Sequence, residues 1–338
     1  MFTIKDVARR SGVSTATVSY VLNNGPRVVR PHTRERVLNA VKELNYRPSA
    51  VARGLNSKRM DTIGVVMLDT VKSPLDHLYY RTTINGIVDA LSPRKKSVTL
   101  FNGNLWRDEQ QTIPTFCDGR CDGLIVFLAN ESSDLLPALK SQPIPFVVVG
   151  ECGTDPTVSN IDIDNVKAAR LVVDHLIACG HRRIAFFMGD DDLMSSSERY
   201  RGYRDALAAA GLDFDPALVV PGLYDQQSGY ERAVNILPQI APVPTAIFAC
   251  SDLIALGVID ALRERGMAIP GDMSLAGIDG LATPAYPAYT LTTVDQHLAA
   301  LGATAAEMVS SLIEADEPQV LKIIQPCELK IGNTVATI

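Results

Sequence analysis

From Thr62 onward the chain repeats one pattern, in which a short and almost continuously apolar run is followed by an amphipathic stretch with helical spacing. Apolar strands that alternate with helices predict parallel sheets with helices on both faces. There are more strands than one ordinary sheet holds, so we expect two similar doubly wound α/β subdomains with a cleft between them. The apolar runs are TIGVVML, KSVTLFN, GLIVFL, PFVVVG, RIAFFMG, LVVPG, AIFAC and MSLAGID.

The first 59 residues differ from this body in charge as well as in pattern. They contain 12 Lys+Arg and 3 Asp+Glu, a net charge of +9, whereas the whole chain carries −6 and its remainder therefore −15. A small basic segment attached to an acidic body indicates a polyanionic partner. From charge alone, the alternative is a basic face that is simply solvated.

The order of residues in this segment predicts three short helices. Thr3 is placed to cap a first helix that ends at about Ser11, and Ser14 to cap a second that ends at about Leu22. Gly12 lies in the short turn between them, which is the helix-turn-helix pattern. Thr33 is expected to cap a third helix, whose apolar spacing closes a small three-helix core with Val37, Val41 and Leu44.

Two runs in this segment, IKDVARRSGVSTATVSYVLN and TRERVLNAVKELNYRPSAVARGL, resemble the DNA-binding head of the LacI/GalR family of bacterial transcription regulators. The resemblance implies that residues 1–47 form a helix-turn-helix DNA-binding domain in which Thr15, Ala16 and Tyr20 read bases. Other residues in it are assigned to phosphates, which fix register rather than sequence: Thr17 and Ser19. The remaining residues that we expect to contact DNA here are Thr3, Ser14 and Asn23.

Residues 48–60 are expected to form a hinge helix and linker. A proline followed by an alanine-rich stretch permits one or two helical turns, which are marginal in water by themselves. By the same resemblance, Leu55 is an apolar wedge that enters the minor groove, with Ala52 and Arg53 beside it. The alternative is a plain linker in which Leu55 is half buried.

The body resembles the sensor core of the same family, which has the fold of periplasmic binding proteins. We therefore expect residues 61–338 to form a ligand-binding and dimerisation core. The resemblance places the crossings between its two subdomains near residues 161, 290 and 325. The first subdomain then comprises about 61–161 with 291–325, and the second about 162–290 with 326–338.

Side chains that follow the strands are the candidates for ligand binding, because ligands in open α/β sheets bind beyond the carboxyl ends of the strands. Arg199 and Asp279 match the family's cleft arginine and ligand-binding acid, and Tyr224 matches an aromatic residue that stacks on the ligand. Such groups suit a polyhydroxylated ligand, because each hydroxyl both donates and accepts a hydrogen bond. The further expected effector-binding residues are Tyr79, Tyr80, Ser195, Ser251 and Gln296.

Alternatives stay open for several of these residues. Tyr79 and Tyr80 are equally well explained by core packing, and the sequence departs from the family pattern just before them, around residues 73–76. It also departs at Gly150, where a family member often has aspartate. Gln296 either contacts the ligand or braces the hinge. Asp252, which follows Ser251, is equally suited to capping the next helix.

No enzyme signature is found in the sequence. GxGxxG after the first strand, GxxxxGK[ST], GxSxG and HExxH are all absent. The six cysteines and five histidines show no zinc spacing, so we expect no metal and no cofactor. No signal sequence and no apolar run of membrane-spanning length is found, and a cytoplasmic protein is expected.

These patterns together predict a ligand-responsive, sequence-specific DNA-binding transcription regulator that is not an enzyme. By the resemblance, it is a repressor controlled by a sugar or sugar derivative, and a homodimer reads a pseudo-palindromic operator in double-stranded DNA. The alternative from another class is a solute-binding module of the same core fold without a role in gene regulation. The basic N-terminal segment favours the regulator.

Overall fold

The computed structural model describes residues 2–23, 28–47, 59–67, 76–102, 113, 116–127, 135–150 and 155–338. The chain divides into two compact units, Met1–Met60 and Asp61–Ile338. No helix within the described ranges combines the length and the apolar character needed to cross a bilayer.

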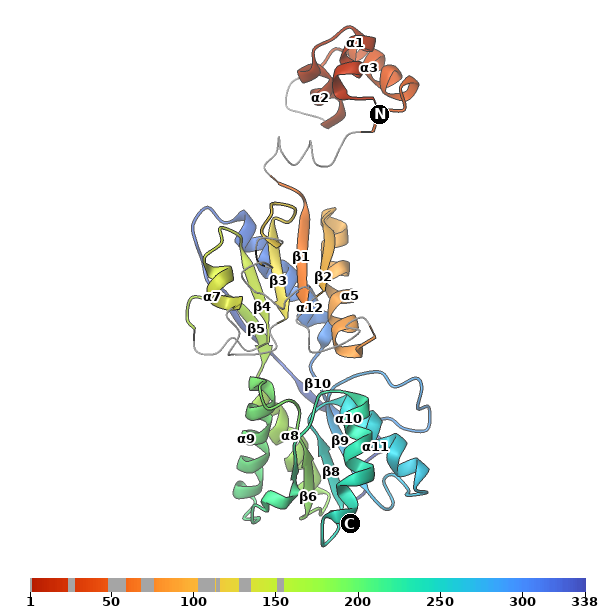
Figure 1. The fold of residues 1–338 in the computed structure, drawn as a ribbon, viewed down its shortest axis with the longest axis vertical. Helices are drawn as coiled ribbons and strands as arrows, with labels where there is room; N and C mark the ends of the chain where they lie inside the picture. Colours follow the sequence, from red (N-terminus) through yellow and green to blue (C-terminus); the bar gives the residue numbers. More distant parts are fainter. Residues whose placement is uncertain are drawn as a thin grey trace. The chain divides into compact units, whose positions relative to one another are not determined.

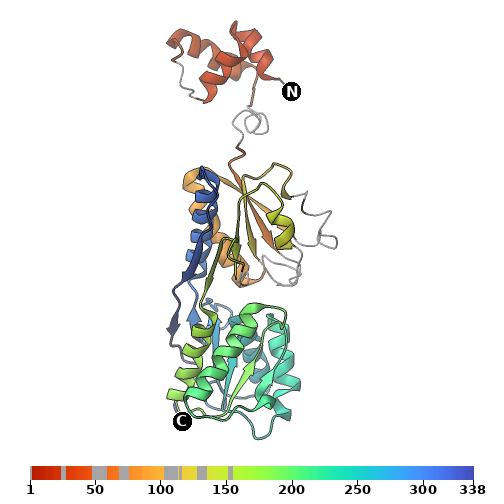
Figure 2. The same ribbon diagram turned by 90° about the vertical axis from the view of Figure 1, so that its left-hand side faces the viewer.

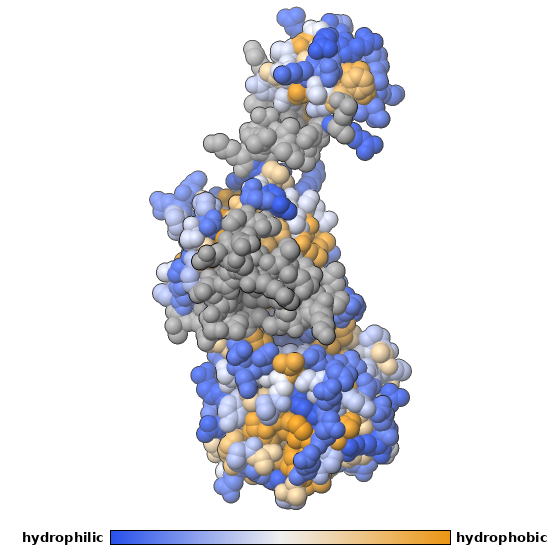
Figure 3. Space-filling model, in the orientation of Figure 1, coloured by the Kyte–Doolittle hydropathy of each residue, from blue (hydrophilic) through white to orange (hydrophobic). Residues whose placement is uncertain are grey.

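In its described part, the first unit consists of three helices, α1 (Ile4–Ser11), α2 (Thr15–Asn23) and α3 (Pro31–Glu43). Gly12 ends α1 with a φ of 63°, a left-handed conformation that glycine adopts at little cost. Hydrophilic side chains dominate the visible face of this unit (Figure 3). Its core is formed by small aliphatic side chains from all three helices: Val7, Ala8, Val18, Val21, Val37 and Ala40.

The third helix begins earlier than predicted. Arg30 occupies the N-cap position and Pro31 the first helical position, so Thr33 lies inside the first turn and does not cap the helix. Proline favours the first position because it has no amide hydrogen to leave unpaired and its φ is already helical. The other two predicted caps are confirmed, since Thr3 is the N-cap of α1 and the hydroxyl of Ser14 caps α2.

In its described part, the second unit contains two six-stranded sheets, each with helices on both faces (Figure 1). The first sheet has the order β11-β5-β4-β3-β1-β2, and its strands pair in parallel. Helices α5 (Leu78–Leu91) and α12 (Leu298–Glu314) cover one face, and α7 (Leu135–Lys140) lies on the other (Figure 2). The strands are β1 (Thr62–Met67), β2 (Ser97–Asn102), β3 (Gly123–Phe127), β4 (Phe146–Val149), β5 (Asn160–Ile163) and β11 (Lys322–Gln325).

The second sheet has the order β12-β10-β9-β8-β6-β7. Strand β12 runs antiparallel to β10, and the other pairs are parallel. Helices α8 (Asn165–Ala178) and α9 (Met194–Ala209) lie on one face, and α10 (Gln226–Asn235) and α11 (Asp252–Glu264) on the other (Figure 1). The strands are β6 (Ile184–Phe187), β7 (Val219–Val220), β8 (Ala246–Ala249), β9 (Ser274–Asp279), β10 (Thr292–Asp295) and β12 (Glu328–Lys330), and short 3-10 helices lie at Ser92–Arg94, Pro216–Leu218 and Leu237–Gln239.

The chain crosses between the sheets after β5, after β10 and after β11. Because β10 pairs with β9, the second crossing follows Asp295 rather than lying near residue 290 as predicted. The first crossing follows Ile163, two residues beyond the predicted position near residue 161. The reason for the larger difference is that β9 and β10 are joined by a loop without a helix, so the alternation of strands and helices does not reveal which sheet β10 joins.

Close packing between α5 and α12 depends on a glycine in each helix. A Cβ atom at Gly86 would lie 1.9 Å from the carbonyl oxygen of Ala299, and one at Gly302 would lie 2.0 Å from that of Thr83. Both distances are far below van der Waals contact, so a larger residue at either position would push the two helices apart. Together these helices cover the apolar face of the first sheet: Ile63, Val65, Ile125, Val147 and Ile161.

Candidate DNA-contacting helix and effector site

The first turn of α2 is built around the hydroxyl group of Ser14. Its Oγ accepts a 3.2 Å hydrogen bond from the amide of Thr17 and lies 2.9 Å from Thr17 Oγ1. This capping interaction fixes the start of α2, while Thr15 and Ala16 remain exposed to solvent. Short exposed side chains at the N-terminus of a helix allow it to approach the edges of bases closely.

The other predicted DNA contacts of the first unit differ in their hydrogen bonds and in their exposure to solvent. The amide and the hydroxyl of Thr3 donate to Asp6 Oδ2 at 2.9 and 2.8 Å, and these hydrogen bonds lower the pKa of Asp6. Ser19 and Tyr20 are partly buried along α2, and Asn23 is its last residue. The predicted hinge contacts lie outside the described residues: Ala52, Arg53 and Leu55.

In the second unit, Arg199 lies on α9 and is only 5% exposed. Its Nε donates to Asn165 Oδ1 at 2.9 Å, and its Nη1 donates to the carbonyl oxygen of Cys250 at 2.6 Å. Burial opposes the charge of this side chain, but Tyr224, Cys250 and Asp279 raise the pKa of Arg199 above its ordinary value. Arg199 is therefore a buried cation, and within the described residues its Nη2 has no hydrogen-bond partner.

Tyr224, in the loop after β7, lies beside Arg199. The guanidinium carbon of Arg199 is 5.8 Å from the centroid of the tyrosine ring, within the range of a cation–π interaction. The hydroxyl of Tyr224 lies 3.2 Å from Ser195 Oγ and 3.2 Å from Cys250 Sγ, and burial together with Cys250 raises the pKa of Tyr224. The structure thus brings three predicted effector contacts together: Ser195, Arg199 and Tyr224.

Arg232 holds the loop that carries Tyr224. This side chain is 4% exposed, and burial lowers the pKa of Arg232 to about 10. Sequence reasoning missed it, because in the stretch GYERAVN it has the appearance of a solvated helix charge. Its guanidinium group donates to the backbone carbonyl oxygens of Met188 after β6 at 2.6 Å, of Val220 in β7 at 3.1 Å, of Leu223 after β7 at 3.2 Å, and of Ser228 in its own helix at 3.0 Å.

Asp279 is the last residue of β9 and is 4% exposed. Its Oδ1 accepts a 2.7 Å hydrogen bond from Gln296 Nε2, and its Oδ2 accepts a 3.3 Å hydrogen bond from the amide of Asp252. Burial and the neighbouring Asp252 raise the pKa of Asp279. Its φ of 146° is rare for a residue with a side chain, and such backbone strain is typical of functional sites.

Ser251 caps α11, and the alternative in which Asp252 is the cap is wrong. Ser251 Oγ accepts a 3.3 Å hydrogen bond from the amide of Ile254. Asp252 is the first residue of the helix and points into the interior, where Oδ1 accepts from the hydroxyl of Thr293 at 2.6 Å and Oδ2 from the amide of Leu281 at 2.8 Å. Burial raises the pKa of Asp252. Sequence reasoning considered Asp252 only as a helix cap and did not identify it as a neighbour of Asp279.

Tyr79 and Tyr80 lie in the first turn of α5 and pack edge-on against each other and against Phe127 at the end of β3. Burial and the nearby Asp162 raise the pKa of Tyr79, and Arg199 acts on it in the opposite sense. Tyr79 therefore packs in the core and also lies within electrostatic range of Arg199.

Sequence reasoning missed Asp162 and Asn165, which connect Arg199 to the crossing after β5. Asn165 Nδ2 donates to Asp162 Oδ2 at 3.0 Å, while Asn165 Oδ1 accepts from Arg199. Asp162 is 8% exposed and Asn165 is 1% exposed. The signal that could have found them is their place at the carboxyl end of the run NIDI, where ligand-binding side chains collect in parallel sheets.

Comparisons with known proteins agree with both halves of this architecture. The family model for bacterial regulatory proteins of the lacI family matches residues 3–49, and that for a periplasmic binding protein-like domain matches residues 173–335. The chain is 36% identical to the HTH-type transcriptional repressor PurR of Haemophilus influenzae (strain PittEE) over 313 residues, which is 91% of this chain and 90% of that relative.

Solved structures show the same likeness. The transcriptional regulator CelR in complex with cellobiose matches with a TM-score of 0.75 and 30% identity over 99% of this chain and 100% of that chain. The Lac repressor dimer bound to operator and the anti-inducer ONPF matches with a TM-score of 0.86 and 25% identity over 99% of each chain. The predicted fold is thereby confirmed, and the chain belongs to the lacI family of bacterial regulatory proteins.

Proposed function

We propose that this protein is a transcription repressor whose affinity for operator DNA is set by a small carbohydrate-like effector. The observation that carries the proposal is the buried site in which Tyr224 lies beside Arg199 and Asp279 is within electrostatic range of it, on the same chain as a helix-turn-helix unit whose capped α2 exposes Thr15 and Ala16. A ligand that binds in this site can change the affinity of the DNA-binding helix for its operator. In this proposal the protein binds ligands and DNA and catalyses no reaction. It acts in the cytoplasm, where the bacterial chromosome lies.

In this proposal the first unit reads DNA with the first turn of α2. Thr15, Ala16 and Tyr20 contact bases, while phosphates are held by Thr17 and Ser19 with support from Thr3, Ser14 and Asn23. Leu55, flanked by Ala52 and Arg53, enters the minor groove. A homodimer places two such units on a pseudo-palindromic operator, an arrangement supported by the Lac repressor dimer on its operator.

The second unit holds the effector among side chains of matched chemistry. Arg199 supplies N–H donors, Asp279 has acceptor capacity beyond its two hydrogen bonds, and Tyr224 supplies an aromatic face. Hydroxyl groups of a sugar use all of these at once, and the CelR–cellobiose complex supports a carbohydrate. The remaining effector-contacting residues of the proposal are Tyr79, Tyr80, Ser195, Ser251 and Gln296.

Operator recognition is tested by selecting duplexes from a random pool and measuring their affinity against random DNA at physiological salt. We expect the selected duplex to bind at least about 10³-fold more tightly. Leu55→Ala and Tyr20→Ala should weaken specific binding while leaving nonspecific binding nearly unchanged, because phosphate contacts dominate the latter. Equal affinity for selected and random duplexes would contradict the regulator.

Effector binding is tested by a thermal-shift screen of sugars, since a ligand that binds only the folded state raises Tm. A sugar that raises Tm should also change operator affinity, and Asp279→Asn should remove both effects while operator affinity without the sugar stays close to that of the wild type. A sugar that raises Tm equally in the Asp279→Asn variant would exclude Asp279 from the site.

A further inference from the structure

The side chain of His77, which precedes helix α5, contacts the other subdomain of the second unit. His77 belongs to the first subdomain, which contains the first sheet. Its Nε2 lies 3.4 Å from the backbone carbonyl oxygen of Tyr224, in the loop after β7 of the second sheet. A carbonyl oxygen only accepts hydrogen bonds, so Nε2 carries the hydrogen and donates it. Tyr224 lies beside Arg199 in the proposed effector site, so this contact reaches the site from the opposite subdomain.

Aromatic packing fixes the ring of His77 on the side of the first subdomain. Its centroid lies 5.0 Å from that of Tyr80 and 6.4 Å from that of Tyr79. Tyr80 packs in turn against Phe127 at the end of β3, at 5.3 Å. A hydrogen bond of 3.4 Å is long and therefore weak by itself. Because the ring is already held in position, however, little conformational entropy is lost when this hydrogen bond forms.

The contact lies away from the crossings between the two sheets. The crossing strands β5 and β11 are at one end of the strand order of the first sheet, and β10 and β12 are at one end of the second. His77 follows β1, near the opposite end of the first sheet, and Tyr224 follows β7, at the opposite end of the second. A rotation of the subdomains about the crossings therefore moves His77 and Tyr224 apart more than it moves groups at the crossings.

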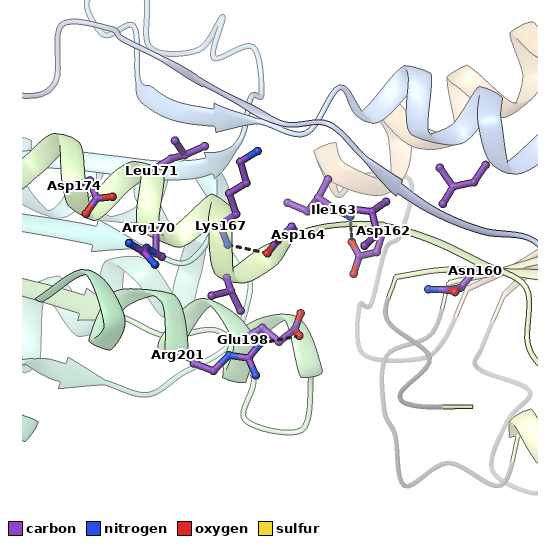
Figure 4. A pocket seen from close by; sticks show the side chains of 13 residues that line it. Asn160, Asp162, Ile163, Asp164, Lys167, Arg170, Leu171, Asp174, Glu198 and Arg201 are labelled. Carbon is purple, nitrogen blue, oxygen red and sulfur yellow. Dashed lines mark hydrogen bonds and ion pairs between the residues drawn. The ribbon is translucent and has the colours of Figure 1, made fainter. Parts of the chain in front are cut away.

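On the side of the crossings, a groove with a volume of about 590 Å³ lies between the subdomains (Figure 4). Asn160 and Ile324 line it from β5 and β11 of the first sheet, and Arg170 and Arg201 line it from helices α8 and α9 of the second subdomain. Closely packed interiors resist movement, whereas open space separates these walls. The groove therefore leaves room for the subdomains to rotate about the crossings.

The contact also has a cost, which keeps it reversible. Within the described residues, Nδ1 of His77 is buried and has no hydrogen-bond partner. Water reaches this nitrogen when the cleft opens, so closing the cleft removes one hydrogen bond to water while it forms the one to Tyr224. The gain and the loss nearly cancel, and the contact by itself leaves the open and closed states similar in free energy. A ligand that binds the closed state better then decides between them.

We propose that His77 is a positioning residue of the effector site, which holds the Tyr224 loop from the first subdomain and so keeps the cleft closed over the effector. It acts through Tyr224 and does not contact the effector itself. Arg232 also supports this loop, but from the second subdomain, so its hydrogen bonds persist when the cleft opens. This role rests on the proposed function, because the effector is the ligand that the closed cleft encloses.

Hydrogen–deuterium exchange of the full chain without ligand tests whether His77 holds the loop. His77→Ala should speed exchange at residues 222–225 at least about threefold, because loss of a hydrogen bond makes local opening more frequent. These residues belong to the other subdomain, so an effect there is not a local consequence of the substitution. His77→Gln places an amide donor at a similar reach and should restore slow exchange. Unchanged exchange in His77→Ala would overturn the proposal, as would exchange in His77→Gln as fast as in His77→Ala.

His175→Gln is the matched control. His175 lies on α8 in the same unit and contacts Cys179 at the end of its own helix, with Nε2 3.8 Å from Sγ. Its replacement should leave exchange at residues 222–225 unchanged. Exchange as fast as in His77→Ala would show that loss of any histidine loosens the loop, and the role of His77 would be wrong.

Acid should release the contact. Burial lowers the pKa of His77, against the opposing effects of the Tyr224 carbonyl and the Asp225 carboxylate, and the other titratable groups near the ring are Tyr79, Tyr80 and Asp76. The closed state is therefore favoured above the ordinary pKa of 6.5 and loses this preference as the pH falls. Exchange at residues 222–225, corrected for its intrinsic pH dependence, should rise about threefold or more between about pH 7.5 and pH 5.5 in the wild type but not in His77→Gln. Equal rises in both would overturn the proposal.

Sugar kinetics test the consequence for the effector, with cellobiose as the first probe and then every sugar that raises Tm. His77→Ala should speed dissociation about three- to tenfold and leave association nearly unchanged, because the contact closes only after the sugar has entered. Unchanged dissociation would overturn the positioning role. A wild type that binds none of the sugars would contradict the proposed function instead, while the exchange measurements still decide whether His77 holds the loop.

Discussion

Gln325 Nε2 donates a 2.7 Å hydrogen bond to the carbonyl oxygen of Gln296, which joins the third crossing between the sheets to the second. The same amide group reaches the carbonyl oxygen of His297 at 3.1 Å, and the side chain of Gln296 in turn donates to Asp279. Asp279, Gln296 and Gln325 are all buried. Asp279 is therefore connected through a continuous set of hydrogen bonds to β11, the last strand of the first sheet.

Gln325→Leu should lower the free energy of unfolding by about 1–3 kcal/mol, because two buried carbonyl oxygens lose their side-chain donor. Urea unfolding at neutral pH measures this change. Gln319→Leu is the control: Gln319 is exposed and makes one long hydrogen bond of 3.4 Å, so its replacement should have little effect. If both variants lose the same stability, Gln325 is not a brace between the crossings.

Arg232→Met should be more costly, by about 3 kcal/mol or more, because four carbonyl oxygens lose their side-chain donor, although that of Val220 keeps the amide of Met188. Methionine keeps much of the length of the side chain, so the loss reports hydrogen bonds rather than a large cavity. Since Arg232 holds the loop of Tyr224, the response to sugar should weaken as well. The exposed Arg263→Met should behave like the wild type in urea unfolding, and a similar loss there would show a general cost of removing arginine.

Much of the second unit follows from the sequence because its strands are buried on both faces. Buried strands are read as apolar runs such as GLIVF, and the alternation with helices then predicts two parallel sheets. Arg199 and Asp279 were found because they match the cleft arginine and the ligand-binding acid of the family, in stretches that follow β6 and end β9, at the edge where ligands bind.

Apart from Asp162 on β5, the residues that were missed are helix residues whose direction depends on tertiary packing. Asn165, Arg232 and Asp252 lie in the first turn or the middle of helices, where a polar residue usually faces solvent. Only the pairing of α8, α10 and α11 with neighbouring loops turns these side chains inward. The sequence also did not reveal that β10 belongs to the second sheet, because the loop that joins it to β9 contains no helix.

Arg199→Lys should separate the charge of this residue from its hydrogen bonds. Lysine keeps the positive charge but cannot bond Asn165 Oδ1 and the Cys250 carbonyl in the same fixed directions. We expect a loss of about 1–3 kcal/mol in the free energy of unfolding and loss of the thermal shift with sugar. Arg201→Lys, two residues along the same helix and exposed, should retain both properties, and a normal sugar response in the Arg199→Lys variant would show that charge alone suffices.

The neighbouring carboxyl groups of Asp252 and Asp279 predict a dependence of stability on pH. Burial raises the pKa of both above the ordinary value of 3.8, and Asp252 adds to the effect on Asp279. The folded state therefore holds these protons more tightly than the unfolded state does. The stability that they contribute is fully present below the unfolded pKa and is lost as the pH rises through the folded pKa values.

Asp252→Asn should reduce this loss, because the pKa of Asp279 then moves back toward its ordinary value. The free energy of unfolding at about pH 5 minus that at about pH 8 should be smaller in Asp252→Asn than in the wild type. The difference comprises the part that Asp252 itself contributes above pH 5 and about 1.4 kcal/mol for each unit by which the pKa of Asp279 falls. Asp213→Asn removes an exposed carboxylate and should keep the pH profile of the wild type. The absolute stability of Asp252→Asn falls at every pH because its hydrogen bonds to Thr293 and Leu281 change, so the slope is the decisive quantity. Parallel profiles for Asp252→Asn and the wild type would show that neither Asp252 itself nor its effect on Asp279 contributes to the pH dependence.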